Sequence, residues 1–322
     1  MQNDRKGHSR RQALKVGAGL GVCAVASVSA WADDNPSRKF TVDLCPGRIG
    51  VKANQMQAIE MAVKHKFESV EPLAWDLAGK SEKQCKAIVE SLDSNSLTWG
   101  AAGLPVDFRN DEDKFQAELK KLPKACEAMA RCGVKRVGTW IMPAHNQLTY
   151  RQNFELHAKR LQKCASVLAK HELGLGLEYV GPKTLWSSMQ YSFVHTMAET
   201  KELIAAIGEN NVGFVLDSWH WYTAKETVAD LLSISAKQIY AVDLNDAPTG
   251  LEIDQQIDQT RTLPAATGVI DVKSFLNALI KLGYDGPVRA EPFDKSLNAL
   301  DNGPALAKTS QAMWKAMNLV GG

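Results

Sequence analysis

Residues 173–178 read LGLGLE, an apolar β-like run that ends in the carboxylate of Glu178. The same design recurs as VGFVLD at 212–217, IYAVD at 239–243 and PVRAE at 287–291. The terminal acids lie 39, 26 and 48 residues apart, and each interval has room for one helix. The four runs therefore read as successive strands of one parallel sheet. In a closed barrel, the carboxyl ends of such strands meet at the face that binds ligands.

Strand parity indicates where these carboxylates point. Because successive strand residues face opposite sides, Glu178 shares its face with Gly176, while the leucines of the run face the other way. Asp217 likewise shares its face with Gly213 and Val215. We therefore expect both carboxylates to point into the barrel with the smaller residues. Four acids gathered there would repel one another unless a cation held them, which predicts a divalent-metal site made of Glu178, Asp217, Asp243 and Glu291.

An ion pair is the alternative explanation for one of these acids. Arg289 has the same strand parity as Glu291, so a buried Arg289–Glu291 pair would account for that carboxylate without a metal. It would leave the other three acids unexplained.

Strand-like and helix-like segments alternate along the whole chain after residue 32, with no break in composition. The strand candidates are Phe40–Cys45, Ser69–Leu73, Thr98–Leu104, Arg136–Met142, Leu173–Glu178, Val212–Asp217, Ile239–Leu244 and Pro287–Glu291. The helical candidates are Asn54–His65, Lys83–Ser91, Asp113–Arg131, Arg151–His171, Val194–Ile207, Thr227–Leu232, Val272–Leu282 and a last helix after Pro304. The alternation predicts an α/β protein, a single (β/α)8 TIM barrel over residues 38–320.

A doubly wound open sheet is the alternative fold, but no Gly-rich phosphate-binding loop follows the first strand. The longest connection, Ala247–Gly268, is polar and contains a proline. Loops of that length in a compact domain tend to be functional, so we expect it over the barrel mouth.

The first 32 residues have the layout of a secretory signal. A basic start precedes a Gly/Ala/Val run over 16–30, and Ala30-Trp31-Ala32 supplies the small residues of a cleavage site. Residues 9–15, SRRQALK, resemble the bacterial twin-arginine motif. The run is too short and Gly-rich to span a membrane comfortably. We predict a twin-arginine signal at 1–32, the twin-arginine export machinery as a partner, and a periplasmic or otherwise exported protein. An uncleaved anchor or a basic tail is the alternative.

Charge and cysteine content narrow the class of protein. Without residues 1–32 the chain keeps 33 basic and 35 acidic residues, a balance that argues against nucleic-acid binding. Its five cysteines form an odd number with no CxxC pair, which argues against a disulfide framework. Cys126 and Cys132 read as helix-packing residues. We expect no stable membrane insertion and leave a homo-oligomer open.

The segment DSWHW at 217–221 is the densest local signal for a binding site. Trp219 and Trp221 flank His220 directly after the strand-ending Asp217. Aromatic faces often contact the apolar C–H face of a sugar ring, so Trp219 and His220 are candidate substrate-binding residues. The other reading of a lone histidine is a structural one.

These strings carry a resemblance to a known family. LEYVGP, LDSWHW, VDLNDAP and VRAEPF resemble the successive strand ends of the xylose isomerase-like barrels, in particular the sugar phosphate isomerase/epimerase family with its ketose 3-epimerases. The resemblance covers essentially the whole chain after the signal and is strongest over 174–293. It implies one bound Mn2+, Mg2+ or Co2+ ion.

The resemblance also implies a reaction and roles for residues. Glu178, Asp217, Asp243 and Glu291 would hold the metal, and Glu178 and Glu291 would also remove and return a proton next to a carbonyl. The product of that step would be a metal-stabilised enediolate. His220 would either bond a substrate oxygen or complete the metal shell. Epimerisation, aldose–ketose isomerisation and β-elimination or hydration of a keto-sugar all begin with the same step.

Two positions depart from the family pattern. Asp243 stands where the family has a histidine, and an all-oxygen ligand set favours Mg2+ or Mn2+ over Zn2+. Thr184 stands where the epimerases carry a further substrate-binding glutamate. The resemblance therefore specifies the substrate contacts less closely than the metal ligands.

Further candidates and alternatives complete the hypothesis. Glu71 at the end of the second strand, His145 just after the fourth and Arg261 in the long loop are candidate substrate-binding residues. The leading function is a metal-dependent sugar isomerase or epimerase acting on a small sugar or keto-sugar. The alternatives are a keto-glycoside lyase or hydratase, an AP endonuclease-like enzyme and a non-catalytic sugar-binding barrel.

Overall fold

The computed structural model describes residues 37–109 and 111–320. Contacts divide the chain into two units at Asn35 and Pro36, and all described residues belong to the second. The predicted signal at 1–32 lies outside them. Among the described helices, none combines the length and the hydropathy that a membrane span would need.

The described strands form a parallel barrel sheet. Their order is β3-β2-β1-β11-β10-β9-β7-β5-β4. β3 pairs with β2 and β4 pairs with β5, and only Gly100 and Ala101 separate β3 from β4, so this one segment closes the barrel. The predicted TIM barrel is confirmed. The strands are β1 (Thr41–Leu44), β2 (Ser69–Val70), β3 (Thr98–Trp99), β4 (Ala102–Gly103), β5 (Arg136–Trp140), β7 (Gly174–Glu178), β9 (Val212–Asp217), β10 (Ile239–Leu244) and β11 (Pro287–Ala290).

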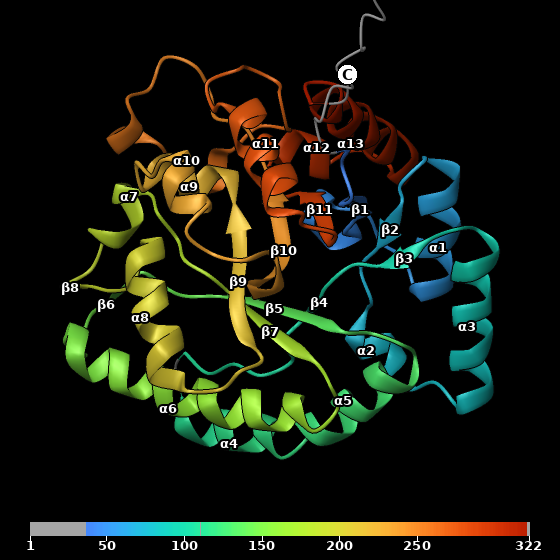
Figure 1. The fold of residues 1–322 in the computed structure, drawn as a ribbon, viewed down its shortest axis with the longest axis horizontal. Helices are drawn as coiled ribbons and strands as arrows, with labels where there is room; N and C mark the ends of the chain where they lie inside the picture. The colour runs from blue at the N-terminus through green and yellow to red at the C-terminus, as the bar shows by residue number, and fades with distance from the viewer. Residues whose placement is uncertain (1–36, 110, 321–322) are drawn as a thin grey trace, which may run out of the picture. The chain divides into compact units, whose positions relative to one another are not determined.

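Helices surround the strands (Figure 1). The longer ones are α1 (Gln55–Lys64), α3 (Glu82–Ser94), α4 (Glu112–Leu119), α5 (Leu122–Arg131), α6 (Tyr150–Ala169), α8 (Met197–Ile207), α11 (Val272–Leu282) and α13 (Asn302–Met317). The short ones are α2 (Ala74–Leu77), α7 (Lys183–Trp186), α9 (Ser218–Thr223), α10 (Val228–Leu231) and α12 (Lys295–Asn298). Short 3₁₀ turns are η1 (Pro46–Ile49), η2 (Ala236–Gln238), η3 (Ile253–Gln255) and η4 (Asp258–Thr260).

Local sequence explains the helix boundaries. Ser81 caps α3 in a capping box with Gln84, and Gly208 and Gly283 close α8 and α11 with left-handed backbone. The single helix expected over 113–131 is instead α4 and α5. Pro123 lies in the first turn of α5, where its missing N–H is tolerated, and its ring opposes continuation of the preceding helix.

The barrel interior confirms the parity argument. Val215 is buried with Ala101 and Ala241 in a small cluster of its own, separate from the larger core between strands and helices. A Cβ on Gly176 would lie 2.8 Å from Val215 Cγ2, so the glycine makes room for this interior side chain. Residues of this parity therefore face inward, as expected for Glu178 and Asp217.

A disulfide joins two helices, contrary to the expectation from the cysteine count. Cys85 on α3 bonds Cys132 at the end of α5, across a sequence separation of 47. Cys132 is therefore a disulfide residue and not simply a packing one. The separation in sequence is large and only the tertiary fold brings the two thiols together, so the spacing of the cysteines gave no signal. Cys45, Cys126 and Cys164 are free and buried.

A small antiparallel pair, β6 (Ala144–His145) and β8 (Tyr191–Ser192), lies outside the barrel sheet. β6 belongs to the connection after β5, and β8 to the connection after β7. The pair holds these two loops together, beside the ends of the strands that carry the candidate site.

Candidate active site

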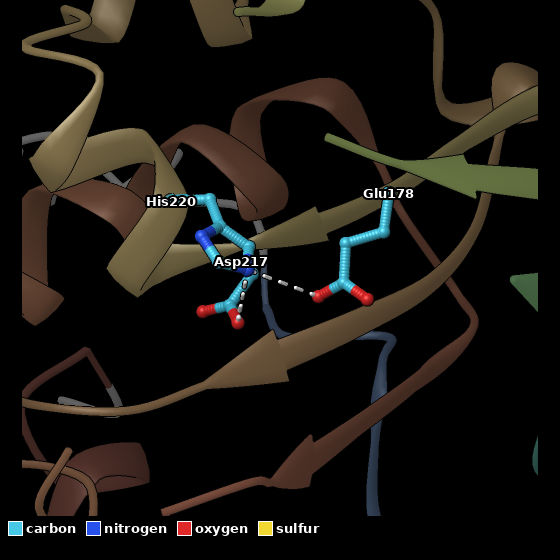
Figure 2. A group of neighbouring side chains, drawn as sticks. All are labelled: Glu178, Asp217 and His220. Atoms are coloured by element: carbon cyan, nitrogen blue, oxygen red, sulfur yellow. Dashed lines mark ion pairs between the residues drawn. The ribbon is translucent and has the colours of Figure 1, made fainter. Parts of the chain in front are cut away.

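The four strand-end carboxylates gather at one place. Ligand atoms of Glu178, Asp217 and His220 lie within 4.8 Å of one another (Figure 2), as do those of Glu178, Asp243 and Glu291. Glu178 and Asp217 end β7 and β9, Asp243 lies in β10, and Glu291 directly follows β11. All are buried. Glu178 belongs to both groups, so it lies at the centre of the cluster.

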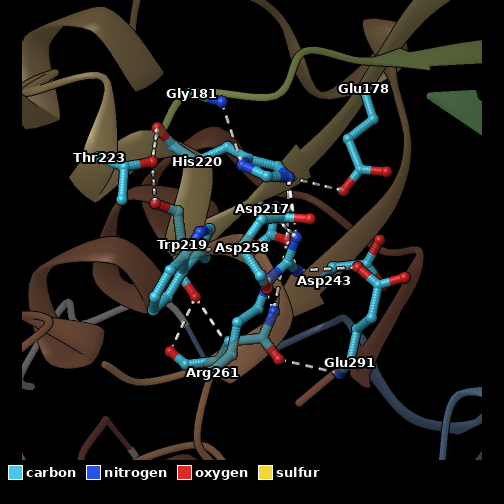
Figure 3. Close-up of polar contacts among 12 residues, drawn as sticks. Glu178, Gly181, Asp217, Trp219, His220, Thr223, Asp243, Asp258, Arg261 and Glu291 are labelled. Atoms are coloured by element: carbon cyan, nitrogen blue, oxygen red, sulfur yellow. Dashed lines mark hydrogen bonds and ion pairs between the residues drawn. The ribbon is translucent and has the colours of Figure 1, made fainter. Parts of the chain in front are cut away.

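Arg261 from the long loop inserts its guanidinium among these groups (Figure 3). Its Nη1 donates to Asp217 Oδ2 at 2.6 Å and to Glu291 Oε2 at 2.8 Å. Its Nη2 donates to Asp258 Oδ1 at 2.7 Å and lies 3.0 Å from His220 Nε2. Arg261 was expected to touch substrate, and the structure places it directly against two of the predicted metal ligands.

Two further arginines neutralise Asp243. Arg289 Nε donates to Asp243 Oδ1 at 2.7 Å, and Arg48 Nη1 lies 3.2 Å from the same oxygen. Arg48 also pairs with Glu291. Burial raises the pKa of Asp243, but Arg289 and Arg48 outweigh it and hold the pKa below its ordinary value. The partner of Arg289 is therefore Asp243, and the Arg289–Glu291 pair considered above does not form.

The position of the proton on His220 follows from one backbone contact. Gly181 N–H donates to His220 Nδ1 at 3.1 Å, so in the neutral ring the proton lies on Nε2. Burial, with Arg261 nearby, lowers the pKa of His220 to about 3, so the ring is neutral at pH 7. Nε2 lies 3.7 Å from Glu178 Oε1 and from Asp217 Oδ2. His220 thus presents a donor to the cavity. Of its two expected roles, this tautomer supports bonding a substrate oxygen.

This tautomer also makes the Arg261–His220 contact unfavourable, because both nitrogens then carry hydrogens. Arg261 is therefore stabilised by carboxylates on one side and opposed by a donor on the other.

The remaining carboxylates differ in how well they are neutralised. Burial raises the pKa of Glu178 well above its ordinary value, and the charges of Glu291 and Asp243 raise it further. Its Oε1 has no hydrogen-bond partner among the described residues. Burial also raises the pKa of Glu291, against the opposing effect of Arg48. For Asp217, burial raises the pKa to about 7 although Arg261 opposes it. Glu178 is the least neutralised acid.

A cavity of about 450 Å³ opens at this cluster. Such a volume lies within the range of small-molecule sites. Its wall combines carboxylates, arginines and apolar side chains, namely Arg48, Trp140, Met142, Glu178, Val180, Leu185, His220, Asp258, Gln259, Arg261, Glu291 and Phe293.

The aromatic wall is not the one expected from the sequence. Trp219 is fully buried, and its backbone N–H donates to Asp217 Oδ1 at 2.7 Å, as Asp217 caps α9. The helical turn carries the Trp219 ring into the core beneath Arg261, whose guanidinium carbon lies 5.6 Å from the ring centroid. Trp221 is buried as well and donates to Thr227 O. Neither ring can present a face to a ligand.

Trp140 and Phe293 form the aromatic wall instead. Trp140 ends β5 with 44% of its surface exposed and lines the cavity. Phe293 follows Glu291 by two residues and covers Arg261 at 4.6 Å. Its φ of 46° is costly for a residue with a Cβ, and such strain often accompanies functional sites.

The two weaker candidates, Glu71 and His145, lie away from the 450 Å³ cavity. Glu71 accepts a hydrogen bond from Cys45 Sγ at 3.0 Å. His145 Nδ1 accepts from the backbone of Gln147 and Leu148 and lines a neighbouring cavity. Neither is placed to touch a ligand bound at the carboxylates.

The long loop lies over the site, as expected, and Asp246 anchors both of its ends. Asp246 Oδ1 accepts from Ala247 N and Ile270 N, and its Oδ2 from Gly268 N. Thr184 donates to Gln256 O at 2.7 Å, so the residue that departs from the family pattern fastens α7 to the loop. These contacts hold Asp258 and Arg261 in the cavity wall.

Several residues of the site were not predicted. Arg48 and Asp258 belong to a turn and a loop, where periodicity carries no information. Asp43 on β1 is buried with both oxygens unpartnered among the described residues, and burial raises its pKa to about 7. A Cβ on Gly100 would lie 2.5 Å from Asp43 Oδ1, so Gly100 makes room for it. The strand parity of Asp43, which matches Arg289 across β1 and β11, could have identified it.

The described residues fit a divalent cation. Five carboxylates face three guanidinium groups, which leaves two negative charges when all are ionised; the acids are Glu178, Asp217, Asp243, Asp258 and Glu291, and the arginines Arg48, Arg261 and Arg289. The unpartnered Glu178 Oε1 is aimed into the cluster. Carboxylate oxygens suit hard divalent ions. The structure therefore contains a candidate divalent-metal site, with no preference among ions.

Comparison with known proteins agrees with this architecture. Residues 59–317 match the family model described as xylose isomerase-like TIM barrel. An inosose isomerase of Bacillus velezensis is 22% identical over 247 residues, covering 75% of this chain and 84% of that protein. A xylose isomerase domain protein of Alicyclobacillus acidocaldarius superposes with a TM-score of 0.75 at 26% identity, covering 87% of this chain and 99% of that one.

Two further solved structures share the fold at lower identity. The IOLI protein with a bound zinc atom superposes with a TM-score of 0.70 at 20% identity, covering 87% of this chain and 98% of that one. D-psicose 3-epimerase, solved in the presence of D-fructose, has a TM-score of 0.65 at 16% identity, covering 84% and 95%.

Proposed function

Because the chain belongs to the xylose isomerase-like TIM barrel family, we propose that it is a divalent-metal-dependent sugar isomerase or epimerase. The relative named inosose isomerase and the structural neighbour named D-psicose 3-epimerase support this class. The observation that carries the proposal is the pair of buried carboxylates, Glu178 and Glu291, that line one cavity with raised pKa values. Carboxylates of raised pKa can both accept and return a proton near neutral pH.

Glu178 and Glu291 have different surroundings and therefore different roles. Glu178 forms no ion pair with an arginine of the described residues, and burial raises its pKa, so it is the proposed base that removes a proton next to a substrate carbonyl. Glu291, paired with Arg48 and Arg261, is the proposed acid that gives its own proton to the opposite face of that carbon, while Glu178 keeps the proton it has removed. His220 Nε2–H donates to a substrate oxygen, because Gly181 fixes the tautomer.

Four carboxylates would hold the metal: Glu178, Asp217, Asp243 and Glu291. When bound, the ion would supply a Lewis acid that stabilises negative charge as a proton leaves the carbon beside the carbonyl. Asn245 positions two of these strands, because its side chain donates to Asp217 Oδ1 at 3.1 Å and accepts from Glu291 N at 2.9 Å. Trp140 and Phe293 would contact the C–H face of the sugar ring.

The second candidate is a lyase or hydratase acting on a keto-glycoside, which begins with the same proton abstraction. One observation favours it. Met142 lines both the carboxylate cavity and the neighbouring one, so there is room beyond a single sugar ring.

We also propose that the protein is exported by the twin-arginine route. The support for the route is the basic, apolar and small-residue layout of residues 1–32 with its twin-arginine-like string. The Cys85–Cys132 disulfide supports export by any route, since disulfides persist mainly in oxidising compartments. Arg10→Lys/Arg11→Lys would retain the protein in the cytoplasm. Equal periplasmic amounts of this variant and the wild type would contradict the route.

Solvent exchange tests the chemistry directly. The purified protein with Mn2+ or Mg2+ is incubated in D2O with inosose, psicose, fructose and tagatose, and proton NMR follows loss of the signal beside the carbonyl. We expect exchange with at least one of them, and a fall of about 10²–10⁴-fold in Glu178→Gln and in Glu291→Gln. Exchange that survives EDTA and both substitutions would overturn the proposal.

A further inference from the structure

We propose that a second compartment beside the carboxylate cavity binds a neutral glycosyl unit, so that the substrate is a glycoside of at least two rings. This rests on the proposed function, because it assigns the rest of the substrate for the same site. The compartment has a volume of about 280 Å³, far above the roughly 10–15 Å³ that one water needs. Its lining includes Arg109, Met142, His145, Asn153, His157 and Met189.

Two deeply buried polar atoms in its lining have no partner. Asn153 and His157 are each 2% exposed, and Asn153 Oδ1 and His157 Nε2 lack a hydrogen bond within the described part of the chain. Both residues lie on α6 one turn apart, so they share one helix face. An unpaired buried polar atom costs about 1–3 kcal/mol. A ligand that bonds both atoms would remove that cost.

The tautomer of His157 defines what such a ligand must offer. His157 Nδ1 lies 2.9 Å from the carbonyl oxygen of Asn153, an acceptor, so Nδ1 carries the proton and Nε2 presents a lone pair. Phe108 and Phe193 pack against the ring at centroid distances of 5.5 and 4.8 Å and fix its orientation. The compartment therefore presents two acceptors, His157 Nε2 and Asn153 Oδ1, that require hydroxyl or amine donors.

The polar groups around the compartment favour a neutral ligand over an anion. Arg109 is a cation in its lining, but Arg109 already donates to Trp140 O at 2.6 Å and to Thr139 Oγ1 at 2.8 Å, and Asp107 lies 3.8 Å away. A phosphate would need free donors and would meet the two acceptor atoms. A ring bearing hydroxyl groups satisfies the acceptors, and Met142 and Met189 provide apolar surface for its C–H face.

The two compartments meet at Trp140 and Met142. Met142 lines both. Trp140 lines the carboxylate cavity, and the guanidinium of Arg109 stacks on its ring at 4.1 Å. A ring held at the carboxylates and a ring held at His157 would therefore lie on either side of this stacked pair. The geometry is that of two adjoining sugar subsites.

Ligand binding to compartment variants tests this inference without turnover. Saturation-transfer NMR and calorimetry compare sucrose, trehalose and cellobiose with glucose, fructose and glucose 6-phosphate on the metal-loaded protein. Met189→Trp fills the compartment from a half-buried position, and Met189→Leu is the matched control. We expect at least one disaccharide to bind tenfold or more tightly than the monosaccharides, and Met189→Trp to remove that advantage while Met189→Leu keeps it.

Other outcomes overturn the inference. Disaccharides that bind no better than glucose, or an advantage that survives Met189→Trp in a protein with unchanged Tm, would contradict a second subsite. Tighter binding of glucose 6-phosphate that is lost in Met189→Trp would assign the compartment to an anion. Disaccharide binding that is sensitive to Met189→Trp, in a protein without solvent exchange on any keto-sugar, would keep the subsite and reject the isomerase proposal.

Discussion

Arg261 Nη1 donates a 2.6 Å hydrogen bond to Asp217 Oδ2, although the two residues are 44 positions apart and come from a loop and a strand end. The bond brings a fixed positive charge into the cluster of acids. It explains how several carboxylates can be buried together without unfolding the barrel mouth. A metal ion held by Asp217 and Glu291, as proposed, would compete with Arg261 for the same oxygens.

Removing this charge should strengthen metal binding. Arg261→Gln keeps a polar side chain but removes the cation from Asp217 and Glu291. We expect the variant to bind Mn2+ at least tenfold more tightly, a change of about 1.4 kcal/mol, as measured by electron paramagnetic resonance titration. Without metal it should unfold at a lower temperature, because buried acids lose their partner.

A distant arginine provides the control for that substitution. Arg136 on β5 pairs with Asp285 and leaves 30% of its side chain exposed. Arg136→Gln should leave Mn2+ affinity unchanged. If Arg261→Gln bound Mn2+ no more tightly than the wild type, competition between the guanidinium and the ion would be excluded.

Replacing the carboxylate by an amide should change the stability of the protein in opposite directions at Glu178 and at Asp243. Burial raises the pKa of Glu178 above its ordinary value of about 4.5, so above that pH the folded state binds more protons at this residue than the unfolded state. The contribution of Glu178 to the free energy of unfolding therefore falls as pH rises above about 4.5. Glu178→Gln should raise the Tm of the metal-free protein by about 2 °C or more. Asp243→Asn leaves Arg289 buried without its charged partner and should cost about 3–5 kcal/mol.

Thermal and urea unfolding in EDTA measure both effects. The Asp243 substitution should be destabilising at every metal concentration, because its main partners are arginines. A stabilising Asp243→Asn, or a destabilising Glu178→Gln in EDTA, would reverse our assignment of which acid is neutralised.

The barrel was predictable from the sequence because side chains along a strand alternate between its two faces with a period of two residues. Alternation of strands and helices gave the fold, and parity placed Glu178 and Asp217 inward, since a two-residue repeat determines the face of each side chain. The site's neutralising arginines were not predictable in the same way. Arg48 and Arg261 lie in non-repeating segments, where long-range contacts such as those of Asp246 determine the position of each side chain.

Trp219 shows how a local motif can mislead. The segment DSWHW suggested aromatic rings at the cavity, but Asp217 caps α9 and the helical turn directs the Trp219 ring into the core. His220, one residue later on the same turn, faces the cavity. Whether a strand-end segment continues as loop or helix therefore decides which side chains reach a ligand.

The Cys85–Cys132 disulfide can be tested by counting free thiols and by measuring the stability of a variant that lacks it. In the chain without residues 1–32, the disulfide leaves three free thiols, Cys45, Cys126 and Cys164. We expect thiol titration of the unfolded oxidised protein to give this number. Cys85→Ala/Cys132→Ala should lose about 2–4 kcal/mol of unfolding free energy, and dithiothreitol should lower the Tm of the wild type but not of the variant. Five reactive thiols in periplasmic protein would contradict the bond.

His157 should make stability depend on pH in a defined direction. Burial lowers the pKa of His157 to about 4, although its bond to Asn153 O opposes the shift. The folded state therefore binds fewer protons than the unfolded state between about pH 6.5 and 4, and the stability that His157 contributes at pH 7 is lost as pH falls through this window. The shift corresponds to about 3 kcal/mol.

His157→Gln removes the titrating group, so urea unfolding at pH 7 and pH 4 should show a fall in unfolding free energy about 3 kcal/mol smaller than in the wild type. His171→Gln, a substitution in the turn directly after α6, is the control and should leave the wild-type fall unchanged. Equal falls in His157→Gln and the wild type would mean that folding does not lower the pKa of His157, and would contradict a ring that burial keeps neutral throughout this window.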